Sequence, residues 1–71
     1  MKFIKIYNTD NTYNSLLNID YIIKIKDSER VLSLKDKKNY VPIEYYINGI
    51  AEALISEKDL KEIMNDKKEG K

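Results

Sequence analysis

Apolar and polar residues alternate along the first half of the chain. Ile4 and Ile6 lie on one side of an extended segment over residues 2–8, and the intervening residues lie on the other. Alternation with a period of two, in a segment rich in β-branched and aromatic residues, predicts a strand. Residues 9–11, Thr-Asp-Asn, have turn chemistry because Asp and Asn side chains bond to nearby backbone. Residues 12–17 are therefore expected to return as the second strand of a hairpin.

The same alternation predicts three more strands after a bend near residues 18–20. They are expected over residues 22–26, 30–35 and 40–41. Ile23 and Ile25 are expected to face inward in the first of these, with lysines facing outward. Pro42 is expected to end the last one, because proline cannot donate a hydrogen bond to the ladder.

From residue 43 the spacing of apolar residues becomes helical. A stripe of four of them spans about 60° of arc at 100° per residue, formed by Ile43, Ile47, Ile50 and Leu54. This stripe predicts a first helix, in which Gly49 would cost about 1 kcal/mol relative to alanine. Ser56 and Asp59 are spaced as in a capping box, which predicts that a second helix covers residues 57–68.

Together these patterns predict an α+β fold: a small, curved antiparallel sheet of four to five strands with one or two C-terminal helices. The chain has 71 residues, enough to bury about three-fifths of its surface in one core. A single domain is expected over residues 1–65, followed by a solvated tail over 66–71. The expected core consists of Ile4, Ile6, Leu16, Ile23, Ile25, Leu32, Leu34, Val41, Ile43, Ile47, Ile50 and Leu54.

The overall charge is nearly balanced, with 13 basic and 12 acidic residues and a formal net charge of +1. That balance, with 42% hydrophobic residues, excludes disorder caused by high charge and low hydrophobicity. No apolar run approaches the length of a membrane span, and the first residues carry lysine within their apolar stretch, unlike a signal peptide. We therefore expect a cytoplasmic protein with no membrane association.

The missing residue types limit the chemistry. The chain has no cysteine, no histidine and only two glycines. Without histidine and cysteine it lacks the usual general base near neutral pH and the thiolate nucleophile. Two glycines cannot make a glycine-rich phosphate loop, and the acidic residues do not have the spacing of a calcium loop. We expect a protein that is not an enzyme and that has no cofactor, metal or catalytic residue.

Three segments resemble one known family. Residues 17–25, LNIDYIIKI, resemble the L-N-x-D-x-I-x-x-I stretch of FlbD-type flagellar regulator proteins. Residues 31–34 and 40–44 resemble the V-I-x-L and Y-x-V-x-E stretches of that family, so the resemblance covers most of residues 1–55. The chain departs from the family at Lys37, where glycine is usual, and at Pro42, where valine is usual. The resemblance implies a small sheet domain with a C-terminal helix and a regulatory, non-catalytic role.

Apolar residues away from the expected core suggest an interface with another protein. Tyr45 and Ile55 lie off the helical core stripe, and the second helix carries a narrow stripe of its own. The second helix can fold back on the sheet, but we expect its stripe to contact a partner, as a homodimer or a hetero-complex. The expected interface is Tyr45, Ile55, Leu60, Ile63 and Met64. We interpret the chain as a small regulatory or inhibitory protein, of chromosomal origin or encoded by a phage or mobile element, such as an anti-CRISPR type inhibitor of host machinery.

The alternative function is a small nucleic-acid-binding module. Six basic residues cluster on the third strand and the hairpin after it: Lys24, Lys26, Arg30, Lys35, Lys37 and Lys38. A basic sheet face with aromatic residues can bind a phosphate backbone. However, acidic residues interrupt the cluster, and lysine on an edge strand also protects a sheet from aggregation. We therefore expect nucleic acid to be a less favoured partner than protein.

Overall fold

The structure, a computed structural model, describes residues 2–69 and the side chains of residues 2–65. In this part of the chain it has an antiparallel sheet and one C-terminal helix, which confirms the α+β class. The strands are β1 (Phe3–Tyr7), β2 (Tyr13–Asn18), β3 (Ile22–Ile25), β4 (Val31–Leu32), β5 (Asn39–Tyr46) and β6 (Ile50–Ser56). A single 3-10 turn, η1 (Ile19–Tyr21), precedes β3, and helix α1 (Glu57–Glu69) follows β6. The expected tail over 66–71 continues as helical backbone to Glu69, and residues 70 and 71 lie outside the described part.

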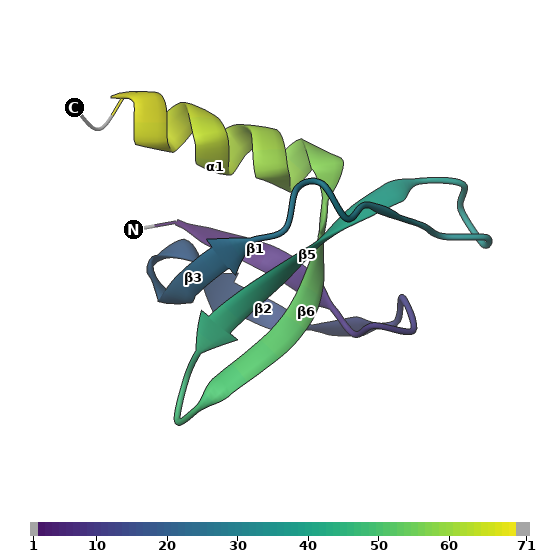
Figure 1. Ribbon diagram of the computed structural model, residues 1–71, viewed down its shortest axis with the longest axis horizontal. Coiled ribbons are helices and arrows are strands. Elements are labelled where there is room, and N and C mark those ends of the chain that lie inside the picture. Colours follow the sequence, from purple (N-terminus) through teal and green to yellow (C-terminus); the bar gives the residue numbers. More distant parts are fainter. Residues whose placement is uncertain (1, 70–71) are drawn as a thin grey trace.

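The sheet is ordered β2-β1-β6-β5-β3, and the short strand β4 also pairs with β5. All of its strand pairs are antiparallel. Helix α1 lies across one face of the curved sheet (Figure 1) and packs on β5 and β6. A sheet with one apolar face is stable only if another element covers that face, and α1 does so here.

The core lies between α1 and this inner face of the sheet. Alternate residues of β5 and β6 point into it, including Val41, Ile43 and Ile55, which are fully buried. From the helix, Leu60 and Ile63 complete the core, with exposed fractions of 4% and 2%. The buried cluster consists of Ile4, Ile6, Leu17, Val41, Ile43, Ala53, Ile55, Leu60 and Ile63.

The prediction of a helix that begins at residue 43 is wrong, because β5 and β6 form a hairpin there. Asn48 and Gly49 in its turn have φ angles of 56° and 135°, which a right-handed helix excludes. Ile47 and Ile50, assigned to the helical stripe, are 49% and 68% exposed. The apolar residues of this segment fit both a helical period and an alternation with a period of two. The Asn-Gly pair between two apolar runs is a hairpin signal, and it favours the strands.

Pro42 lies inside β5 and does not end the strand. Its carbonyl oxygen accepts a hydrogen bond from the backbone N–H of Lys26, at 2.8 Å. In an antiparallel ladder the N–H and C=O of one residue point to the same neighbour, so the missing N–H also faces this side. On that side β3 pairs with residues 43–45 and β4 with residues 39–40. Proline is tolerated because it sits in the gap between the two ladders.

Several residues of the expected core lie at the surface instead. A register shift between Ile22 and Lys24 turns Ile23 outward, leaving it 54% exposed, while Ile22 and Ile25 contact the core. In β2 the inward residue is Leu17, which pairs with Ile4, and its neighbour Leu16 faces out. Where two adjacent residues are both apolar, the alternation does not tell which of them faces the core. Leu32 and Leu34 are also exposed, on a hairpin that extends beyond the core.

Candidate protein interface

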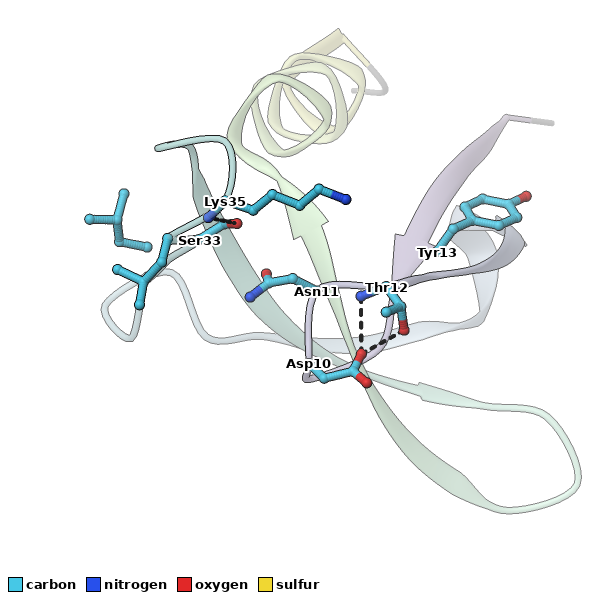
Figure 2. Close-up of a pocket in the computed structure, with 8 residues that line it drawn as sticks. Asp10, Asn11, Thr12, Tyr13, Ser33 and Lys35 are labelled. Carbon is cyan, nitrogen blue, oxygen red and sulfur yellow. Dashed lines mark hydrogen bonds between the residues drawn. The ribbon is translucent and has the colours of Figure 1, made fainter.

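A groove separates two loops that are far apart in the sequence. One is the β1–β2 turn around residues 8–12, and the other is the hairpin end that joins β4 to β5. Both loops lie at the end of the molecule opposite the N-terminus (Figure 1), and they face each other across the groove in Figure 2. The groove has a volume of about 610 Å³ and is lined by Asp10, Asn11, Thr12, Tyr13, Leu32, Ser33, Leu34 and Lys35.

The β1–β2 turn is held by its own hydrogen bonds. The Asp10 carboxylate accepts hydrogen bonds from the Thr12 hydroxyl and from the Thr12 backbone N–H. These bonds, the side-chain bond foremost, lower the pKa of Asp10 below its usual value. The backbone N–H of Asn8 donates to the Thr12 carbonyl at 2.8 Å. The turn therefore presents a preformed wall to the groove.

Asn11 occupies a left-handed conformation in this turn, with φ of 71°. Its side chain points across the groove toward the opposite hairpin (Figure 2). The Oδ1 atom of Asn11 is buried and has no hydrogen-bond partner among the described residues. Buried polar atoms in native proteins almost always have a partner, so this oxygen is an exception, and because it is buried a bound molecule reaches it only if the turn or the side chain moves.

The opposite wall is organised by Ser33, which is buried. Its backbone N–H donates to the Lys38 carbonyl at 2.9 Å, and its carbonyl accepts from the Lys37 N–H at 3.0 Å. The Ser33 hydroxyl oxygen accepts a further bond from the Lys35 N–H at 3.3 Å. These three bonds close the hairpin end, and the Leu34 side chain that it carries is 83% exposed.

Three tyrosines connect the two walls on the outer face of the sheet. The rings of Tyr7 and Tyr13 meet edge to face at 6.1 Å, and those of Tyr7 and Tyr40 lie 5.2 Å apart. The Tyr40 hydroxyl donates to Oδ2 of Asp36 at 2.8 Å. This hydrogen bond and the burial of Tyr40 raise the pKa of Tyr40 to about 12, and the same bond lowers the pKa of Asp36. The cluster joins the β4–β5 hairpin to the sheet.

Replacing Tyr40 with phenylalanine is expected to lower the free energy of unfolding by about 1 kcal/mol at pH 7, because the hydrogen bond to Asp36 is lost. The raised pKa means that this stabilisation is complete below pH 10 and is lost as the pH rises through about 12. It is also lost as the pH falls below 3.8 through the lowered pKa of Asp36. Urea unfolding at several pH values should show the two proteins converging at both extremes. A difference that does not vary with pH would contradict the assignment.

The interface residues expected from the sequence do not form one exposed patch. Ile55, Leu60 and Ile63 lie in the core of the chain itself, where α1 folds back onto β5 and β6. Tyr45 is half-buried and packs against the same core. Met64 is 46% exposed on the outside of the helix. The narrow apolar stripe of α1 is enough to hold the helix against the sheet, because Leu60 and Ile63 both belong to the core cluster.

The six basic residues do not share one face free of acidic groups. The Lys26 ammonium lies between two cross-strand carboxylates, 3.2 Å from Glu52 and 3.4 Å from Glu44. Its pKa is raised, chiefly by the hydrogen bond to Glu52. The Arg30 guanidinium contacts Asp27 at 2.7 Å and Glu57 at 3.2 Å. These pairs oppose the alternative of a phosphate-binding face on β3.

The other lysines take separate positions. Lys24 is exposed on β3, at the far edge of the sheet. Lys35 lines the groove, and Lys37 and Lys38 line a second depression of about 510 Å³ between the hairpin and the start of α1. Lys37 has φ of 59°, the left-handed conformation that glycine adopts most easily. The sequence did not indicate the groove, because its two walls meet only in the folded chain.

No protein family, curated protein or solved structure matches the chain. In the part of the chain that the structure describes, no group of three or more acidic residues is placed to hold a metal ion. No helix among those residues has the length and apolar character needed to cross a membrane.

Proposed function

We propose that this chain is a small, non-catalytic regulatory or inhibitory protein that acts by binding another protein at the groove. The observation that carries the proposal is the exposure of Leu34, which is 83% exposed at the rim. Leu32 and Tyr13, also on the groove, are 51% and 56% exposed. Exposed apolar side chains that gather at one place on a small domain mark an interaction site.

The energetics favour a protein partner. Burying one large apolar side chain contributes about 1.5–3 kcal/mol, so Leu32 and Leu34 together can supply the centre of an interface. Both walls of the groove are held by internal hydrogen bonds, so little conformational entropy is lost on binding. This combination of fixed backbone and exposed leucine is typical of a binding surface.

The groove also defines the partner's chemistry. Lys35 lies on one wall, and Lys37 follows in the same hairpin end. Asp10 lies on the other wall, with its carboxylate engaged by Thr12. The complementary surface is an apolar projection with an acidic group placed against Lys35 and away from Asp10. The proposal covers both a phage-encoded inhibitor of a host enzyme and a chromosomal regulator of FlbD type.

Affinity capture from a host lysate, with and without nuclease, tests the proposal. The wild-type chain is expected to retain a protein that the Leu34→Asp variant binds about 30-fold more weakly, the effect of losing an interface hot spot of about 2 kcal/mol. Ile47→Asp is the matched control, because Ile47 is exposed on the other hairpin turn and its change should leave capture intact.

Salt and nuclease distinguish the alternative. Retention through phosphate contacts weakens steeply as salt rises, whereas an apolar interface responds little. Capture that disappears with nuclease and is unchanged by Leu34→Asp would overturn the proposal in favour of nucleic acid. Equal loss of the captured protein in the Leu34 and Ile47 variants would place the interface elsewhere.

A further inference from the structure

Strand β2 forms one edge of the sheet, at the opposite end from β3. It pairs with β1 on one side, and no other described strand pairs with it. The outer edge of such a strand presents backbone N–H and C=O groups that another strand can pair with. Natural proteins usually protect an edge of this kind with charged residues, proline or a bulge.

The charge pattern of β2 sets it apart from the rest of the chain. Charged residues make up 35% of the sequence, but residues 11–19, NTYNSLLNI, contain none and contain no proline. The opposite edge strand, β3, carries Lys24 and is followed by Lys26. A bulge in β2 beside Tyr13 shortens its regular part to Ser15–Asn18. The regular part of the edge has neither charged residues nor proline to prevent another strand from pairing with it.

We propose that β2 pairs with β2 of a second copy of this chain, antiparallel and about a two-fold axis perpendicular to the sheet. Such a pairing is isologous, so every residue of the strand meets a residue of the same strand. A charged edge strand would then face its own charge, which is destabilising. The absence of charge in β2 removes this repulsion, whereas self-pairing of β3 would bring lysines together. The occupant that fits this edge is therefore a second copy.

The faces of the sheet determine the register. Residues directly opposite each other in antiparallel strands lie on the same face, so Leu16 can oppose Leu16 of the other copy while Ser15 opposes Leu17. Leu16 is 58% exposed on the outer face, and this register brings the two Leu16 side chains into contact. The regular ladder is short, so the dimer is expected to be weak and to form only at high protein concentration.

Sedimentation equilibrium of the full chain tests this pairing. The wild type is expected to shift from 8.4 kDa toward twice that mass as its concentration rises to about 1 mM. The Leu16→Glu variant is expected to dissociate at least about tenfold more readily, because two carboxylates then face each other. The variant should still fold, since Leu16 pairs with Lys5 on β1 and glutamate attracts that lysine.

Three further samples make the result decisive. An equal mixture of the Leu16→Glu and Leu16→Lys variants should recover the dimer at low salt, because opposite charges then meet across the axis. The Ile23→Glu variant, on the β3 edge, and the Leu34→Asp variant, at the groove, should show the same rise of mass with concentration as the wild type. A wild type that stays at 8.4 kDa at every concentration overturns the proposal, as does a dimer that persists in Leu16→Glu or is lost in Ile23→Glu. Loss of the dimer in Leu34→Asp alone would also overturn it, because the contact would then lie at the groove.

Discussion

Replacing Ile63 with alanine is expected to lower the free energy of unfolding by about 2–5 kcal/mol. The side chain is only 2% exposed and belongs to the core cluster between α1 and the sheet. A chain of 71 residues has a total stability of only about 4–10 kcal/mol, so the variant should be largely unfolded under mild denaturing conditions. Urea titration followed by circular dichroism measures the loss.

Met64→Ala is the matched control for this change. Met64 is the next residue of the same helix, and it is 46% exposed. Its replacement removes a side chain of similar size from a position that contributes little burial, so the midpoint should move by less than a third of the Ile63 effect. Equal losses from the two substitutions would contradict the packing of α1 against β5 and β6.

Replacing Gly49 with alanine is expected to destabilise the chain by about 1–3 kcal/mol. Gly49 has φ of 135°, a conformation that residues with a Cβ rarely adopt. A Cβ built on Gly49 meets no atom within 4 Å, so the whole cost arises from the backbone and not from a clash. Thermal unfolding by circular dichroism gives the size of the effect.

Asn48→Gly serves as the control for the turn. Asn48 has φ of 56°, which asparagine tolerates and glycine adopts freely, so this variant should be close to the wild type. Two consecutive positive φ angles account for the opposite effects of the two substitutions. If the Gly49→Ala variant unfolds at the same temperature as the wild type, the β5–β6 turn has a different backbone conformation.

Local chemistry allowed several elements to be predicted from sequence. The turn at residues 9–11 and the bend after Asn18 both use side chains that bond to nearby backbone, as the structure shows for Asp10 and Asn18. The start of α1 was also predicted, and the Ser56 hydroxyl accepts a hydrogen bond from the Asp59 N–H at 3.2 Å. These signals depend on only a few adjacent residues, so no tertiary contact is needed to read them.

The elements predicted wrongly depend on contacts between distant residues. Ile43, Ile47, Ile50 and Leu54 fit a helical period, but the alternating residues of β5 and β6 are the ones that meet the core. Ile63 was expected at an interface because its burial depends on whether the sheet reaches the helix. The groove required both the β1–β2 turn and the β4–β5 hairpin to be placed in space. Leu32 and Leu34 alternate with polar residues as in a core strand, so the sequence alone predicts them in the core.

The order of the strands has a consequence for how the chain reaches its native state. β1 precedes the other described strands in the chain but lies between β2 and β6, and Tyr7 pairs with Leu54, which is 47 residues later. During synthesis one side of β1 therefore stays unpaired until β6 has been made. Pairing between such distant segments makes folding slow and leaves the waiting strands open to other chains. Emergence of residues 50–56 from the ribosome is then the step after which β1 can pair on both sides.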